Sequence, residues 1–367
     1  MAYALRQLGS TYELVFNHTL AGGGGFRLRL GELENGLSFA PKHATPDTIW
    51  FRRFTRINIP DWVHPLDRRN AEGEWDAVLR SLRQLSRGRG SPFCVNPPEE
   101  AFGAGLKPVQ LAAASRVGLT IPETLVSNSK AEVLAFEKDV GQIIYKSLIS
   151  PGWVLPGDVD TWIPTTPIKA QDLPESSLQA CPGIFQAYVP KAFEARVTVM
   201  GHEIFAVAID SQSDPKTQVD WKGRGGSTRG MLRGRIEPPP EVRSNILALM
   251  RELKIIFGCL DFVIRPDGEW VFLEVNPQGQ FLWVEREDES FPLLDAFTRF
   301  LLSNDDHFTY EPPDKPISLC QMARAPADQA WIEANRAIPP YIDPYIAFEE
   351  PTQTEPGRSE ALGMERT

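Results

Sequence analysis

The chain has 367 residues, of which 42% are hydrophobic, enough for two or three folded domains with sizeable cores. Its net charge of −10 comes from 38 basic and 48 acidic residues, and this balance excludes broad nucleic-acid binding, which needs a basic surplus. No apolar run approaches the roughly 20 residues of a membrane helix and the start lacks a signal-peptide pattern, so we expect a cytoplasmic protein without membrane attachment.

The first part of the chain is predicted to be a small α/β domain. Its glycine run at 21–25 is interpreted as a flexible connection, because it lacks the GxxxxGK[ST] or strand-GxGxxG-helix context of a phosphate-binding loop. The predicted elements are strands near 13–17, 26–30 and 48–53, followed by a helix over 74–85.

A second region begins at the Asn-Pro-Pro sequence of residues 96–98. A helix is predicted over 106–117 with Lys107 near its start, and the strand QIIYK at 142–146 ends on a lysine. The stretch 150–173 is rich in Pro, Gly, Thr and Asp, so we expect a long mobile loop of the kind that covers active sites.

The third region is predicted to be mostly antiparallel strands. A strand over 184–189 is followed by a hairpin over 195–209 that turns at Gly201. The segment 216–235 is rich in glycine and basic residues and has no periodicity, and 241–253 has the spacing of an amphipathic helix. Beyond about residue 304 a Pro- and Glu-rich tail is predicted to be partly disordered.

A second hairpin is predicted around the sequence CLDFVIRPDGEWVFLEVNPQGQ, with its turn at 266–268. Pairing about this turn places Asp261 opposite Glu274. The two-residue period of a strand then predicts two faces, Val271, Leu273 and Val275 on one and Phe272, Glu274 and Asn276 on the other.

Two carboxylates directly opposite each other repel, so this hairpin needs a compensating cation. Asp261, Glu274 and Asn276 offer only hard oxygen ligands, which suits Mg²⁺ shared with phosphate oxygens better than zinc or copper. The alternative interpretation is an exposed hairpin whose acids are simply hydrated.

Other metal and nucleophile chemistries have no local support in the sequence. The four cysteines lie far apart without a CxxC pair, and the five histidines show no HExxH spacing. No GxSxG motif is present. A disulfide framework, a zinc protease and a serine hydrolase are therefore not indicated.

The strings DFVI and FLEVNPQGQ, together with the lysine-ended strand QIIYK, resemble the ATP-grasp fold over about residues 96–302. That resemblance implies an α+β protein in which ATP is clamped between two α+β subdomains, with Mg²⁺ held by a late strand. It also implies a division into an N-terminal pre-ATP-grasp-like α/β domain at 1–95, a central subdomain at 96–185, a C-terminal subdomain at 186–304 and a tail at 305–367.

Within ATP-grasp proteins, three segments resemble the graspetide synthetases, including the microviridin cyclases: LEVNPQGQFLWVE, TIWFRRFTR and SQSDPKTQVDW. Those enzymes close side-chain ester or amide rings in ribosomally made precursor peptides. The resemblance implies an ADP-forming ligase that phosphorylates an Asp or Glu side chain of the peptide, which a Thr or Ser hydroxyl or a Lys amine then attacks. A precursor peptide with leader and core is the implied partner, and a homodimer is left open.

The resemblance also implies roles for residues on the nucleotide side. Lys107 and Lys146 would contact the phosphates of ATP, and Glu194 would bind the ribose hydroxyls. The adenine edge would be bound by backbone groups of Gln186, Ala187, Tyr188 and Val189, where Ala187 replaces the acidic residue common in the family.

On the reacting side, the resemblance implies that Arg196 faces the transferring phosphate, with a carboxylate partner elsewhere in the chain as the alternative. Lys216 and Arg224 would stabilise the acyl-phosphate or hold the acidic side chain of the peptide, and solvated loop charges are the alternative. Arg52 and Arg53 are assigned to peptide binding, whereas the adjoining Trp50 is equally well a core residue.

Three other interpretations remain open at the level of sequence. An ATP-grasp ligase that adds a free amino acid to a protein or small acid, like the ribosomal-protein glutamate ligases, would use the same ADP-forming step. A catalytically dead member would only bind a leader peptide. Finally, Thr352, Thr354 and nearby glutamates could form a fused substrate, with an ordinary disordered end as the alternative.

Overall fold

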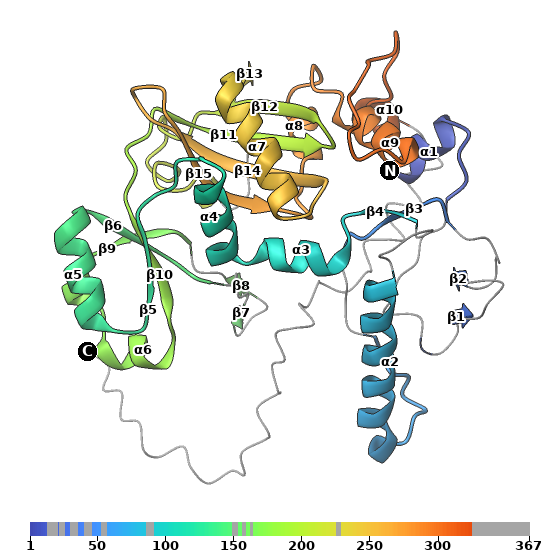
Figure 1. The fold of residues 1–367 in the computed structure, drawn as a ribbon, viewed down its shortest axis with the longest axis horizontal. Helices are drawn as coiled ribbons and strands as arrows, with labels where there is room; N and C mark the ends of the chain where they lie inside the picture. The colour runs from blue at the N-terminus through green and yellow to red at the C-terminus, as the bar shows by residue number, and fades with distance from the viewer. Residues whose placement is uncertain are drawn as a thin grey trace. The chain divides into compact units, whose positions relative to one another are not determined.

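The computed structural model divides the chain into two compact units (Figure 1). One comprises Met1–Glu13, Thr45–Arg52 and Val78–Arg336, and the other Leu14–Ala44, Arg53–Ala77 and Ala337–Thr367. The structure describes residues 1–12, 21, 26–29, 36–39, 46–52, 57–85, 92–148, 153–155, 159–161, 164–224 and 229–324. The strand predicted at 13–17, Arg53, and the tail hypotheses at Thr352 and Thr354 lie outside these residues.

The second unit contains an antiparallel pair, β1 (Phe26–Arg29) with β2 (Gly36–Phe39), and the beginning of α2 (Pro65–Leu85). Helix α2 begins at Pro65, well before the predicted start at residue 74. Proline suits the first helical turn, and Asp67 complements the helix dipole there. The first turns are mostly polar, so their sequence carries no apolar period from which a helix could be predicted.

A four-stranded antiparallel sheet in the first unit has the strand order β5-β10-β6-β9. Val133, Ile143, Leu178 and Phe185 form a core between this sheet and two helices. The strand that ends on Lys146 is confirmed. The elements are β5 (Thr124–Ser127), β6 (Ile143–Lys146), β9 (Thr166–Ile168), β10 (Gly183–Ala187), α5 (Lys130–Val140) and α6 (Glu175–Ala180).

The prediction of one long loop over 150–173 is wrong where this segment forms strands. β7 (Trp153–Leu155) pairs with β8 (Val159–Thr161), and β9 extends the four-stranded sheet by pairing with β6. Each of these strands has three residues, too few for an alternation of apolar and polar side chains to emerge. Pairing with a distant partner, which sequence patterns do not reveal, makes them strands.

A five-stranded antiparallel sheet has the order β13-β12-β11-β14-β15. Both predicted hairpins are confirmed, and each turns at a glycine with positive φ, Gly201 at 61° and Gly268 at 89°. The strands are β11 (Phe193–Met200), β12 (Glu203–Ile209), β13 (Leu232–Ile236), β14 (Phe257–Ile264) and β15 (Trp270–Asn276).

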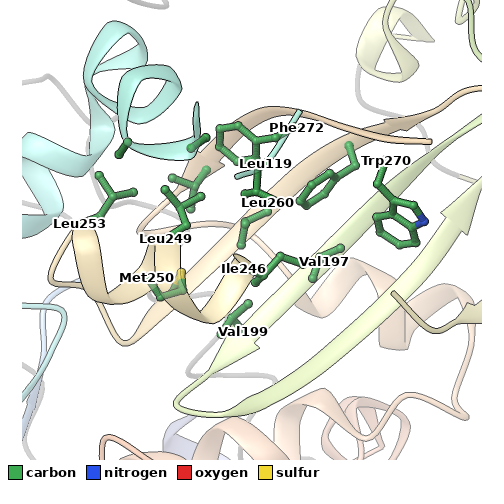
Figure 2. Packing of buried hydrophobic residues seen from close by; sticks show 14 of the residues in the cluster. Leu119, Val197, Val199, Ile246, Leu249, Met250, Leu253, Leu260, Trp270 and Phe272 are labelled. Carbon is green, nitrogen blue, oxygen red and sulfur yellow. The ribbon is translucent and has the colours of Figure 1, made fainter. Parts of the chain in front are cut away.

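One face of this sheet is covered by α4 (Lys107–Arg116) and α7 (Pro240–Glu252), close to their predicted bounds (Figure 1). Apolar side chains of both helices and the sheet interlock there (Figure 2), among them Val197, Ile246 and Leu260. Because strand side chains alternate, Glu194, Arg196 and Asp261 point to the opposite face. The helical layer therefore leaves the other face free to carry polar groups.

That opposite face is apolar at one end, where Met200 and Phe257 pack against α8 (Leu282–Glu287) and α9 (Leu293–Ser303). The other elements of the first unit are α1 (Ala2–Gln7), the parallel pair β3 (Thr48–Trp50) and β4 (Phe93–Val95), α3 (Pro98–Gly105), the 3-10 turns η2 (Ala170–Asp172) and η3 (Trp221–Arg224), and α10 (Leu319–Ala323). Among the described residues, no helix combines the length and apolar character needed to cross a membrane.

The outer edge of β15 is held by groups that substitute for a missing strand. The side-chain amide of Gln110 donates from Nε2 to the Val275 carbonyl at 2.8 Å and accepts from the Val275 amide at Oε1 at 2.9 Å. The Phe272 amide donates to the Thr120 carbonyl at 2.8 Å. Buried Gln110 thus fixes the strand that carries Glu274.

Replacing Gln110 with leucine is expected to lower the free energy of unfolding by about 2–4 kcal/mol, because the buried amide and carbonyl of Val275 lose their partner. Urea denaturation measures this loss. Gln179→Leu, on the exposed surface of α6, is the matched control and should change stability little. Equal stability of the two variants would contradict the role of Gln110.

Candidate active site

A pocket lies between the two large sheets, both within the first unit. Its walls come from β6 and β10 on one side, from β11, β14 and β15 on the other, and from the segment around η3. Among its lining residues are many of those selected from the sequence: Lys107, Lys146, Gln186, Ala187, Tyr188, Val189, Glu194, Asp261 and Glu274.

Asp261 and Glu274 are direct neighbours across β14 and β15, which confirms the predicted pair. A bulge follows, so that Phe262 pairs with Phe272 and Leu273 is the extra residue. The predicted face assignment is therefore wrong: Phe272 and Val275 share the helical core, whereas Leu273 and Glu274 both line the pocket. The bulge has no sequence signal, because apolar residues 270–273 run without a break into the bulge and show no alternation that would place it.

The compensating cation that these carboxylates require is the side chain of Lys222, a residue that the sequence did not single out. Its Nζ donates to Asp261 Oδ2 at 3.1 Å and to Glu274 Oε1 at 2.8 Å. The ammonium of Lys222 holds the pKa of Glu274 well below its ordinary range. Burial lowers the pKa of Lys222, but the carboxylates of Asp261 and Glu274 more than offset this effect and raise it overall. Both partners are therefore charged near neutral pH.

Arg196 lies on β11 directly opposite Asp261. Its NH1 donates to Asp261 Oδ1 at 2.7 Å and its NH2 to the carbonyl of Gln280 at 3.0 Å, just after β15. Its Nε is buried and has no hydrogen-bond partner among the described residues. Arg196 therefore positions Asp261 and retains one donor for another acceptor.

The strand end of β10 forms the wall where an adenine ring was predicted. The amides of Ala187 and Tyr188 already donate to the carbonyls of Glu123 and Gln142, at 2.9 and 2.8 Å, and cannot serve a ligand as well. Gln186 is 1% exposed and donates from Nε2 to Thr124, but its Oε1 has no partner within the described part of the chain. This acceptor in the pocket wall suits an amino group of a ligand.

Glu194 forms a buried ion pair with Lys191, which the sequence analysis also missed. Lys191 Nζ lies 2.9 Å from Glu194 Oε1 and donates to the Val219 carbonyl at 2.8 Å, and the two side chains are 3% and 4% exposed. Burial raises the pKa of Glu194, and Lys191 opposes that rise. The pair is local, three residues apart, but only burial distinguishes it from an ordinary surface pair.

Two lysines face the carboxylates from the other side of the pocket. Lys146 ends β6, and burial lowers its pKa, opposed by the charge of Glu274. Lys107 is the first residue of α4, and its Nζ lies 3.4 Å from the carbonyl of Leu148. Together with Lys222 they form a positive wall that suits phosphate groups.

Other predicted site residues do not line the pocket. Asn276 is exposed, and its Oδ1 accepts from the Gln278 amide at 3.0 Å, although an amide oxygen can accept a second partner. Arg52 donates to the Gln278 carbonyl at 2.8 Å and lies over Trp50, which packs in the core against Phe297.

Of the basic segment after β12, Lys216 is exposed and lies away from the pocket, whereas Lys222, six residues on, reaches it. Arg224 ends η3, but its side chain lies outside the described part of the structure, as does Arg53. Spacing alone does not distinguish the two lysines, because the segment has no regular period.

The side chains in and beside the pocket fit the Mg²⁺ and nucleotide that the sequence implied. Asp261 and Glu274 present carboxylate oxygens to one point, where a cation is already required, and hard oxygen ligands suit Mg²⁺. Arg196 Nε and Gln186 Oε1 have no partner in the part of the chain that the structure describes. With the lysines, they suit a nucleotide that carries phosphates and an exocyclic amino group.

No protein-family model and no curated protein matches the chain. Solved structures do. Macrocyclase MdnC from Microcystis aeruginosa MRC, bound with precursor peptide MdnA, is 25% identical, with 83% of this chain and 94% of that chain covered at a TM-score of 0.67. MdnB from the same organism is also 25% identical, with 82% and 93% covered at a TM-score of 0.64.

A RiPP-associated ATP-grasp ligase of Chryseobacterium gregarium, in complex with ADP and a leader and core peptide, is 22% identical, with 83% of this chain and 89% of that chain covered at a TM-score of 0.67. The ATP-grasp ligase PsnB, complexed with minimal precursor, Mg and ADP, is 21% identical, with 82% and 92% covered at a TM-score of 0.62. The chain thus has the α+β fold of ATP-grasp ligases, which confirms the predicted fold class and the structural resemblance to peptide macrocyclases.

Proposed function

We propose that this protein is an ATP-dependent macrocyclase of a ribosomally made precursor peptide. It would phosphorylate Asp or Glu side chains and join them to Thr or Ser hydroxyls or Lys amines, releasing ADP and phosphate. The observation that carries the proposal is the pair of opposed carboxylates, Asp261 and Glu274, in a pocket lined by four lysines, with buried Arg196 bonded to Asp261 beside it. The peptide-bound MdnC structure supports a peptide as the substrate.

In this proposal the central subdomain spans 96–185 and the C-terminal subdomain 186–304, after an N-terminal domain at 1–95 and before a tail at 305–367. Asp261 and Glu274 hold Mg²⁺, with Asn276 as a further oxygen ligand. Lys107 and Lys146 bind the phosphates. The adenine edge meets the Gln186 side chain and the carbonyls of Ala187 and Tyr188 with the amide of Val189, and Glu194 binds the ribose.

A carboxylate is a poor acyl donor, so the side chain of the peptide must be activated before ring closure. Bound Mg²⁺ supplies charge neutralisation for the triphosphate. Arg196 is held by Asp261, and among the described residues no acceptor takes the hydrogen of its Nε, so it can donate to the transferring phosphate without first reorganising. Arg52, Arg53, Lys216 and Arg224 remain proposed contacts of the peptide or the acyl-phosphate.

Intact-mass spectrometry tests the proposal with ATP, Mg²⁺ and a Thr- and Glu-rich peptide encoded by a short reading frame beside the gene. The expected result is the loss of one water from the peptide per ring, with one ADP formed each time. Reactions without ATP are the control. A gain in mass after addition of free amino acids, with no loss of water, would instead indicate an amino-acid ligase and contradict the macrocyclase proposal.

A further inference from the structure

The ammonium of Lys222 lies where the side chains of Asp261 and Glu274 meet. Its Nζ donates to Asp261 Oδ2 and to Glu274 Oε1, while Arg196 NH1 donates to Asp261 Oδ1. Two carboxylates, one ammonium and one guanidinium leave this group of side chains electrically balanced. The two carboxylates are therefore stabilised by cations from the chain itself.

A divalent cation held by the same two carboxylates would bind Asp261 Oδ2 and Glu274 Oε1, the oxygens that accept from Lys222. Mg²⁺ binds oxygen at about 2.0–2.1 Å and demands near-octahedral geometry. The Lys222 ammonium lies 3.1 and 2.8 Å from Asp261 Oδ2 and Glu274 Oε1. Two cations with three positive charges between them would repel strongly at this separation. Metal and ammonium consequently compete for one position.

The side chain of Lys222 can move although its backbone is held. The side chain is 44% exposed, in contrast to Asp261 and Arg196, which are 5% and 6% exposed. The preceding Trp221 is buried and packs against Trp283, with 5.2 Å between ring centroids. A displaced ammonium thus stays tethered beside a pocket that Lys107 and Lys146 also line.

We propose that Lys222 is an exchangeable counter-ion of the site. It holds the cation position while the site is unloaded and moves to the phosphates when metal and nucleotide bind together. This inference rests on the proposed function of Asp261 and Glu274 as metal ligands. It follows that a divalent cation alone binds weakly, and that nucleotide strengthens metal binding by giving Lys222 another partner.

Titration with Mn²⁺, followed by the electron paramagnetic resonance signal of the free ion, tests the exchange without a catalytic assay. Without nucleotide, Lys222→Met should bind Mn²⁺ about tenfold or more tightly than the unchanged protein. ADP should increase Mn²⁺ affinity strongly in the unchanged protein and less in Lys222→Met. The exposed Lys138→Met on α5 removes the same charge far from the pocket and should leave the affinity unchanged.

Thermal melting provides a second readout, since Lys222→Met leaves Glu274 without its lysine partner and Asp261 with Arg196 alone. Mn²⁺ should raise the melting temperature of this variant more than that of the unchanged protein, and Lys222→Gln should behave in the same way. Equal Mn²⁺ dissociation constants without nucleotide would overturn the role of Lys222 and leave the metal site intact. No Mn²⁺ binding by any of these proteins, even with ADP, would overturn the metal assignment as well.

Discussion

Glu274→Gln is expected to lower peptide-dependent ADP formation by about 100-fold or more. The substitution keeps the size of the side chain but removes one of the two negative charges that meet at Lys222. With a single carboxylate left opposite Arg196 and Lys222, the site no longer attracts a divalent cation strongly. Coupled-enzyme detection of ADP, with saturating peptide, measures the loss.

The matched control is Asp267→Asn at the tip of the same hairpin. Asp267 is exposed, and its Oδ1 accepts from the Glu269 amide, an acceptor role that asparagine preserves. This control should turn over normally. Lys222 still pairs with Asp261 in Glu274→Gln, so the variant should fold like the unchanged protein. Normal turnover by Glu274→Gln would contradict the metal assignment.

Lys191→Met is expected to cost about 3–5 kcal/mol of folding free energy, because it leaves the carboxylate of Glu194 buried without a counter-ion. The pKa of Glu194 is already raised by burial, and loss of Lys191 raises it further. A raised carboxyl pKa favours folding at low pH, and this contribution is lost as pH rises from the ordinary pKa of glutamate to the folded one. The penalty should therefore grow with pH.

Urea denaturation of Lys191→Met at acid and neutral pH measures this effect. The double variant Lys191→Met with Glu194→Gln removes the uncompensated charge and should recover much of the stability. Its unfolding free energy should also depend less on pH. A single variant as stable at neutral pH as the unchanged protein would show that the pair is not the buried ion pair described above.

Local sequence patterns predicted the parts of the fold that depend on local physics. The turn at Gly268 needs a positive φ, and the sequence predicted both this hairpin and the pair of Asp261 with Glu274. Counting outward from the observed pair Ile264–Trp270 reaches Asp261 and Leu273, so the bulge is what brings Glu274 opposite Asp261. The apolar period of α7 predicted its bounds closely. The order of the strands within the two sheets was not predicted from periodicity. The resemblance to the ATP-grasp fold supplied the expected architecture.

What the sequence could not give depends on contacts between distant segments. The bulge at Leu273 reverses the face of Phe272, and both residues belong to an apolar run, 270–273, that shows no alternation. Lys222 contacts residues 39 and 52 positions away, whereas Lys216 of the same segment does not reach the pocket. Nothing in the sequence distinguishes Gln110 from other helix glutamines, because its role depends on the edge of β15 that it pairs with.

The activation of a peptide carboxylate is the central claim, and an isotope experiment tests it most directly. The side-chain carboxyls of the precursor peptide are labelled with ¹⁸O, and the phosphate released with ATP and Mg²⁺ is analysed by mass spectrometry. An acyl-phosphate transfers one labelled oxygen from each activated carboxyl to phosphate, so one ¹⁸O per ring is predicted. Peptide rings formed with unlabelled phosphate would contradict the account.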